Sequence, residues 1–170
     1  MRVTPQLVQT LDHTYQALRA HHQDLPNAMI TVETPHPAVT NRLAYYTPEQ
    51  IITTGGTYDG RIVFLLPPRH RNHLPCAFTH GPETTFEVLI HESAHALAAA
   101  RGIKDTSRGG TYHNKRFAAL ATELGLEVDG DSAKCENTAA PPALIAQYRR
   151  HIDALRDALP TPLIVNRAGR

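Results

Sequence analysis

Cysteine is scarce in this 170-residue chain, which contains only Cys76 and Cys135. The two lie far apart and form no Cys-x-x-Cys pair, so the sequence predicts reduced thiols rather than a disulfide framework or a zinc ribbon. Long apolar runs are also missing. Without a stretch of 18 consecutive apolar residues, the sequence predicts no membrane-spanning helix. The first residues lack the apolar core of a signal peptide, and we therefore expect a cytoplasmic protein.

A strong charge of one sign is absent as well. The chain has 17 Lys and Arg residues against 16 Asp and Glu residues, for a formal net charge of +1. This balance gives no global argument for a nucleic-acid partner, and short basic pairs such as Lys115 with Arg116 are typical of solvated faces. Charge alone neither supports nor excludes DNA binding.

Histidine, in contrast, is plentiful, with 11 residues, and one motif is built on it. Residues 91–95 read HESAH, an HExxH pattern, within a segment that predicts a helix over residues 84–102. Thr84 followed by Glu87 predicts a capping box, and Gly102 suits the left-handed position that ends a helix. The motif is therefore expected on one continuous helix.

On that helix, the two histidines of the motif would have a defined spacing and direction. Four residues correspond to about 400° of rotation, so His91 and His95 would share one face, one turn apart. The spacing suits two imidazole nitrogens that bind one Zn²⁺ at about 2.0–2.1 Å each. Glu92, rotated by about 100°, is suited to hold and deprotonate a metal-bound water. A fortuitous pattern is the competing interpretation, because short motifs arise by chance in a histidine-rich chain.

The composition, 41% hydrophobic and 19% charged, predicts one ordinary globular domain, which we place over residues 1–160 with a C-terminal tail over 161–170. Short β-branched segments separated by Pro and Gly predict a three- or four-stranded, mainly antiparallel sheet, with strands at residues 28–33, 42–46, 50–54 and 61–66. The last of these has the most continuous apolar run and should be well buried. The fold class is therefore expected to be α+β.

Three further helices are expected around this sheet. One should span about residues 5–22, and another about residues 113–124, with Gly125 as its stop. His113 would then point into the domain from the first turn of that helix. The last helix should carry an apolar stripe from Leu144 to Leu159, which needs a partner in the same domain or in a dimer.

A catalytic zinc keeps three protein ligands and one open position, so the motif needs a third ligand. The extended metzincin pattern is rejected, because it requires glycine and histidine where this chain has Ala98 and Arg101. Two alternatives remain open on the residues: Glu123 or Glu127, near the end of the second expected helix, and His113 at its start. Glu123 would lie about 15 Å along the helix from His113, so the two cannot bind the same ion.

The segments LIHESAHAL (89–97) and YHNKRFAALATELGL (112–126) resemble the SprT-like (Spartan-like) metallopeptidase family. The resemblance covers roughly residues 84–126. It implies a minimal zincin-like fold, with a small sheet packed on the HExxH helix, and His113 as the third ligand. The chain departs from many members, because two isolated cysteines cannot build their zinc-ribbon module. The DNA-directed regions of Spartan-like proteases are not visible either, so DNA as a partner is implied by the resemblance alone.

The leading interpretation is a zinc-dependent endopeptidase, a hydrolase with a protein or peptide substrate. Glu92 would take a proton from the metal-activated water and pass it to the leaving amine, while one catalytic Zn²⁺ is held by His91, His95 and His113. Tyr112 could donate a hydrogen bond to the developing oxyanion, although packing or exposure is its commoner role. An extended substrate could pair with a sheet edge, for which residues 61–66 are the candidate strand.

Two other classes of function compete with this interpretation. A non-catalytic protein-binding domain could keep zinc as a structural staple, closed by a fourth ligand from the loop histidines His70, His73 or His80. Glu92 argues against it, because a structural site does not need that carboxylate. A nuclease or other hydrolase with two metals would require an acidic cluster that the sequence lacks.

Overall fold

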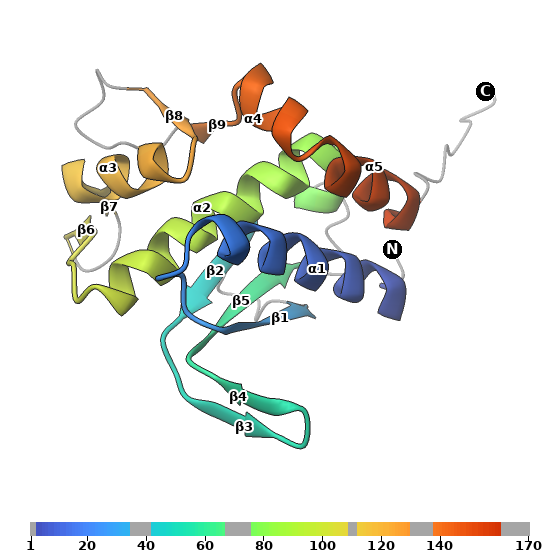
Figure 1. The fold of residues 1–170 in the computed structure, drawn as a ribbon, viewed down its shortest axis with the longest axis horizontal. Helices are drawn as coiled ribbons and strands as arrows, with labels where there is room; N and C mark the ends of the chain where they lie inside the picture. The colour runs from blue at the N-terminus through green and yellow to red at the C-terminus, as the bar shows by residue number, and fades with distance from the viewer. Residues whose placement is uncertain (1–2, 35–41, 67–75, 109–111, 130–137, 161–170) are drawn as a thin grey trace, which may run out of the picture.

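A computed structural model describes residues 3–34, 42–66, 76–108, 112–129 and 138–160. Within these ranges the fold is α+β, as expected (Figure 1). The helices are α1 (Pro5–His21), α2 (Pro82–Ala100), α3 (Lys115–Glu123), α4 (Pro142–Gln147) and α5 (Arg149–Ala158), with a short 3₁₀ helix, η1 (Ala77–Thr79). The strands are β1 (Ala28–Glu33), β2 (Ala44–Thr47), β3 (Ile51–Thr53), β4 (Gly56–Tyr58), β5 (Gly60–Leu65), β6 (Thr106–Ser107), β7 (Tyr112–His113), β8 (Glu127–Val128) and β9 (Thr138–Ala139).

The largest sheet has three strands in the order β1–β5–β2. β2 runs antiparallel to β5, whereas β1 runs parallel to it, with Ala28 opposite Gly60 and Ile30 opposite Ile62. The expected mainly antiparallel arrangement is therefore wrong for the β1–β5 pair, because β5 inserts between two strands that precede it in the chain. The expected strand at 50–54 is also not part of this sheet: β3 pairs with β4 in a separate hairpin that projects from the body (Figure 1).

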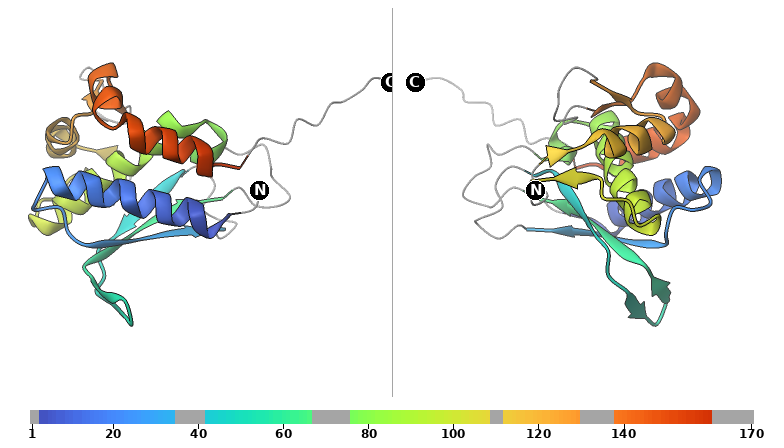
Figure 2. Two further views of the ribbon diagram at one scale, coloured as in Figure 1. Left: turned by 45° about the vertical axis from the view of Figure 1, so that its right-hand side comes forward. Right: turned by 90° about the vertical axis from the view of Figure 1, so that its left-hand side faces the viewer.

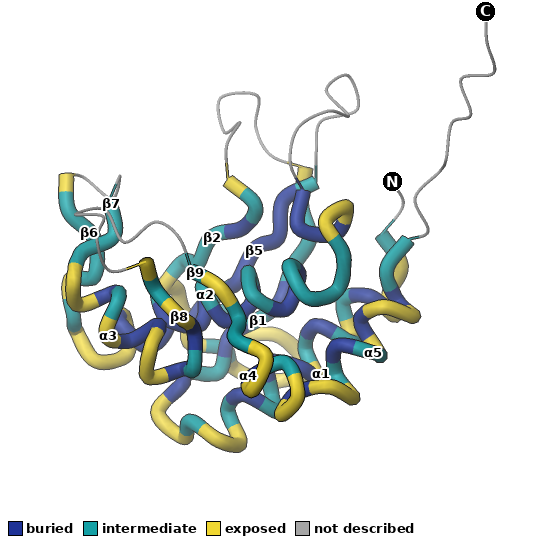
Figure 3. Tube along the Cα trace, turned by 90° about the horizontal axis from the view of Figure 1, so that it is seen from above, coloured by how far each residue is buried: buried dark blue, intermediate teal, exposed yellow. Residues whose placement is uncertain are grey.

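The central position of β5 follows from its composition. Residues 62–65 (IVFL) are all buried, from 0% exposure at Ile62 to 4% at Leu65, which confirms that this run is well buried (Figure 3). β-Branched and aromatic residues on both faces are typical of a central strand, which has a neighbouring strand on each side. β2 and β1 are therefore the two edge strands of the sheet.

Two helices cover one face of the sheet. α1 packs against β1, α2 packs against β2 and β5, and α5 lies on both helices on the side away from the sheet (Figure 2). The stripe on α1 is buried as expected, and the hydroxyl of Tyr15 donates a hydrogen bond to the carbonyl of Pro26 at 2.8 Å. The expected last helix is present but divided at Tyr148 into α4 and α5, and it finds its packing partner within the domain.

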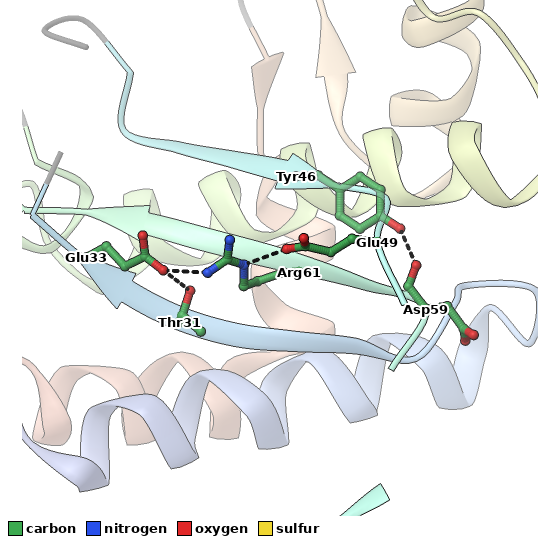
Figure 4. A network of polar contacts seen from close by, with 6 residues as sticks. All are labelled: Thr31, Glu33, Tyr46, Glu49, Asp59 and Arg61. Atoms are coloured by element: carbon green, nitrogen blue, oxygen red, sulfur yellow. Dashed lines mark hydrogen bonds and ion pairs between the residues drawn. The ribbon is translucent and has the colours of Figure 1, made fainter. Parts of the chain in front are cut away.

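The opposite face of the sheet carries a polar network (Figure 4). Arg61 of β5 donates to Glu33 at 2.7 Å and to Glu49 at 3.0 Å. These side chains are 29–42% exposed, so the ion pairs contribute only about 0–1 kcal/mol each to stability. The network fixes the outer surface of the sheet and leaves the helix-covered face as the core.

The helix that carries the HExxH motif begins earlier than expected. α2 starts at Pro82, with Gly81 at the N-cap in a left-handed conformation (φ 98°). The capping box is wrong: the hydroxyl of Thr84 donates back to the carbonyl of His80 at 3.4 Å. Proline suits the first turn of a helix, where its missing N–H has no intrahelical partner to lose. The expected end of the helix is confirmed, because Gly102 follows the last turn in a left-handed conformation, with φ 63°.

The expectations for the cysteines and for membrane-spanning helices can be compared with the structure only over the described residues. Cys76 is a buried free thiol, while Cys135 and the tail at 161–170 lie outside the described residues. None of the helices in the described part of the chain combines the length and apolar character that crossing a membrane requires.

Candidate metal centre

Three histidines from two elements form the candidate site. His91 and His95 lie on α2, as the motif predicts, and His113 lies in β7, which pairs with β6 through Thr106 opposite His113. The expectation that His113 belongs to the first turn of the next helix is wrong. Asn114 is the N-cap of α3, and its Oδ1 accepts the N–H groups of Arg116 and Phe117 at 2.8 and 3.2 Å. Asparagine is among the strongest N-cap residues, so the helix starts after it.

The ring nitrogens of these three histidines converge. One ligand atom from each lies within 4.8 Å of the others, and Nε2 of His95 is 3.0 Å from Nε2 of His113. Two nitrogens bound to one tetrahedral zinc at 2.0–2.1 Å would lie roughly 3.4 Å apart. His91, His95 and His113 can therefore hold one metal ion, as expected from the sequence.

The other candidate ligands do not join this group. Glu123 accepts two hydrogen bonds from the guanidinium of Arg101, at 2.6 and 2.7 Å, and Glu127 is exposed in β8. His80 is exposed at the end of η1. Among the described residues, the three-histidine group is the only set of His, Cys, Asp or Glu side chains placed to bind a metal. His70 and His73 lie outside the described residues.

Two of the three imidazoles have a hydrogen-bond partner on their other nitrogen. Nδ1 of His91 is 3.2 Å from Oγ1 of Thr138 in β9, and Nδ1 of His95 is 2.5 Å from Oδ2 of Asp105. Nδ1 of His113 is buried and has no partner among the described residues. Such partners fix the ring orientation and tautomer of metal-binding histidines.

Sequence reasoning missed both partners. Asp105 carried a weak local signal, as a carboxylate in the polar loop that follows Gly102. Thr138 carried none, because it lies 47 residues beyond His91.

Burial keeps two of the histidines neutral. Burial, with a smaller contribution from the neighbouring His95, lowers the pKa of His91 to about 3 and that of His113 to about 4. Neutral imidazole is the form that binds a metal. The surroundings therefore hold these side chains in the protonation state that a ligand requires.

Glu92 is buried next to this group. Burial raises the pKa of its carboxyl to about 7, against the lowering effects of His95, of Arg42 and of the backbone N–H of Tyr46 in β2. Its Oε2 is buried without a hydrogen-bond partner among the described residues. A buried carboxyl whose pKa lies near neutrality can both accept and release a proton at physiological pH. Arg42, an exposed cation that precedes β2, is another neighbour that sequence reasoning missed.

Tyr112 precedes His113 in β7. Consecutive side chains of a strand point to opposite faces, so its ring lies across the hairpin from the imidazole of His113. The guanidinium of Arg108 lies 5.1 Å from the centroid of the Tyr112 ring. A role for Tyr112 in oxyanion stabilisation stays a prediction.

Comparison with known proteins adds no relative: no family model matches the chain, and no curated protein or solved structure matches it significantly. The resemblance to SprT-like peptidases consequently stays a prediction from the two sequence segments. What can be concluded about function rests on the chemistry and geometry of the site itself.

Proposed function

We propose that this chain is a zinc-dependent endopeptidase of the SprT-like, zincin-like type, with protein or peptide as its substrate. The observation that carries the proposal is the buried carboxyl of Glu92 beside three converging imidazoles. A site that only staples the fold has no use for a buried carboxyl with one oxygen, Oε2, left without a hydrogen bond among the described residues, because burial of such a group is unfavourable. A hydrolase that transfers a proton at this position does use such a carboxyl.

The donor set suits zinc. Three neutral imidazoles leave an open position at a tetrahedral ion, as catalytic zinc sites do. Zinc bound there would supply Lewis-acid activation of a water molecule and of the scissile carbonyl. His91, His95 and His113 would hold the ion through the nitrogens that face one another. Glu92 would accept a proton at its carboxylate and deliver it to the leaving amine.

The edge to which a substrate could add is β2. The strand at 61–66 cannot serve, because β5 is paired on both sides. The carbonyl of Leu43 accepts the N–H of Leu65 at 2.9 Å, so by the alternation of an antiparallel ladder the backbone groups of Ala44 and Tyr46 face away from β5. This outer side of β2 lies against α2 at Glu92. Because the N–H of Tyr46 is directed at Glu92, an extended peptide would pair with this edge at Ala44 and would run past the proposed base.

The non-catalytic alternative is less favoured. It gives the buried carboxyl of Glu92 no role, whereas a hydrolase uses it as a base. The alternative keeps one prediction of its own, that zinc binds and nothing is cleaved. DNA as a further partner rests on the family resemblance alone and is not part of the proposal.

Glu92→Gln tests the proposal, because it keeps the shape of the side chain and removes its basicity. We expect the parent protein to bind about one zinc and to cleave an unfolded protein substrate. The variant should bind zinc equally and lose about 10²- to 10⁴-fold in kcat/KM. Glu123→Gln, which removes a carboxylate that pairs with Arg101, is the matched control and should cleave normally. Unchanged cleavage by Glu92→Gln with normal zinc content would overturn the proposed mechanism.

A further inference from the structure

Among the described residues, Asp105 makes the only ion-pair contact to one of the three converging histidines. Its Oδ2 lies 2.5 Å from Nδ1 of His95, and the two side chains are only 15% and 19% exposed. An ionised carboxylate can only accept hydrogen bonds, so Nδ1 of His95 carries the proton. The lone pair is then on Nε2, the atom that lies 3.0 Å from Nε2 of His113. Asp105 thus selects the tautomer in which His95 can bind a metal.

The backbone of Asp105 reaches the third histidine. Its carbonyl accepts the N–H of Asn114 at 2.9 Å, directly after His113 in the chain. The side-chain amide of Asn114 donates to the carbonyl of Lys104 at 2.9 Å, and Thr106 pairs with His113 in the β6–β7 ladder. The segment 104–106 therefore holds the strand that carries His113. One residue contacts both halves of the site, through its side chain to α2 and through its main chain to β7.

Charge gives a second reason for a carboxylate here. Three neutral imidazoles do not compensate a divalent cation, and an uncompensated charge in a largely buried site is unfavourable. The other helix histidine has only the neutral hydroxyl of Thr138 on its Nδ1. Asp105 and Glu92 together supply two negative charges when ionised. Of these two carboxylates, only that of Glu92 is used in the proposed proton transfer, and that of Asp105 is not.

We propose that Asp105 is the positioning residue of the metal centre: its carboxylate fixes the His95 ring with Nε2 toward the ion, and its backbone holds the strand that carries His113. The inference deepens the proposed function, since it rests on the same metal site. It does not depend on peptidase activity, because its consequence is metal affinity.

The test compares Asp105→Asn and Asp105→Ala with the parent protein. Zinc affinity is measured by competition with a chromophoric chelator, and ligand geometry by the visible absorption of the cobalt(II)-substituted proteins. We expect Asp105→Asn to lower zinc affinity about 10- to 100-fold, and Asp105→Ala to lower it at least as much and to change the cobalt spectrum. Asp12→Asn, which removes a carboxylate of α1, is the matched control and should stay within twofold of the parent.

Folding and function are kept separate in this design. Circular dichroism of the metal-free proteins shows whether the variants fold, and Asp105→Asn, which keeps the size of the side chain but removes its negative charge, carries the test if Asp105→Ala fails to fold. Affinities within twofold of the parent for both variants, with an unchanged cobalt spectrum, would overturn the role of Asp105 and leave the peptidase proposal standing. If the variants bind zinc more weakly than the parent but the parent cleaves no substrate, the role of Asp105 is supported and the peptidase proposal is overturned. A parent that binds no zinc would overturn both.

Discussion

Nε2 of His95 and Nε2 of His113 lie 3.0 Å apart, although 18 residues separate the two histidines in the chain. With Nδ1 of His95 donating to Asp105, its Nε2 presents a lone pair to the other ring. Two lone pairs at this distance repel unless a proton or a metal ion lies between them. Without a metal, a neutral His113 can supply that proton in its Nε2–H tautomer, because its Nδ1 has no partner among the described residues that fixes the other tautomer. A metal ion between the two nitrogens would replace this proton and be bound by both lone pairs.

Metal removal should therefore lower thermal stability. A ligand that binds only the folded state at a free concentration 1,000 times its Kd adds about 4 kcal/mol to the free energy of unfolding. For a domain of this size that corresponds to a Tm about 8–16 °C higher with zinc than with chelator. Differential scanning calorimetry measures the shift, and His113→Ala should lose most of it. Identical melting temperatures with zinc and with chelator would contradict a folded-state metal site.

The identity of the third ligand gives a second prediction. His113→Ala should reduce the zinc content from about one per chain to well below that value while circular dichroism stays native-like. Glu123→Gln and Glu127→Gln should keep full zinc, because Glu123 pairs with Arg101 and neither carboxylate belongs to the three-histidine group. Elemental analysis of the purified proteins decides the matter. Zinc retained by His113→Ala and lost from Glu127→Gln would reverse the assignment.

Local signals in the sequence predicted the helix that carries His91 and His95 well. The four-residue spacing of His91 and His95 and the stop at Gly102 act within a few turns, so neighbouring residues alone determine them. The start of the helix was placed wrongly, because two local signals compete there. Gly81 and Pro82 begin the helix before the Thr84 and Glu87 pair can act as a capping box.

The relations that the sequence did not reveal are those between distant segments. β5 pairs with β1 from 32 residues away, and nothing in the apolar run at 61–66 indicates which strands will flank it. The partners of the histidines show the same limit. The family resemblance grouped His113 with His91 and His95, although the helix position expected for it is wrong, whereas Asp105 and Thr138 become neighbours of the site only through tertiary packing.

Replacement of Gly60 should destabilise the fold for reasons of space. A Cβ added there would lie 2.1 Å from the hydroxyl oxygen of Tyr46 and 2.5 Å from two ring carbons, where the ring crosses the start of β5 near Asp59 (Figure 4). Gly60→Ala should therefore destabilise the protein by about 1–3 kcal/mol in urea unfolding. Gly55→Ala is the control, because its nearest neighbour would be Oγ1 of Thr53 at 3.6 Å. Removal of the ring by Tyr46→Ala should relieve part of the effect in the double variant, and fully additive free energies would contradict the clash.

Alkaline pH should destabilise the fold through Tyr15. Burial raises the pKa of this hydroxyl well above its usual value near 10, and Tyr46, whose own pKa is raised to about 12 by burial, raises it further. The folded state then binds the proton more tightly than the unfolded state, so the contribution to stability is complete below about pH 10 and falls as the pH rises above it. Tyr15→Phe should lose about 1 kcal/mol at neutral pH, with the hydrogen bond to Pro26, and should show a shallower decline between pH 9 and about 11.5. Urea unfolding at each pH, with the same chelator throughout, measures both effects. A decline as steep in Tyr15→Phe as in the parent would mean that another group titrates on unfolding in this range.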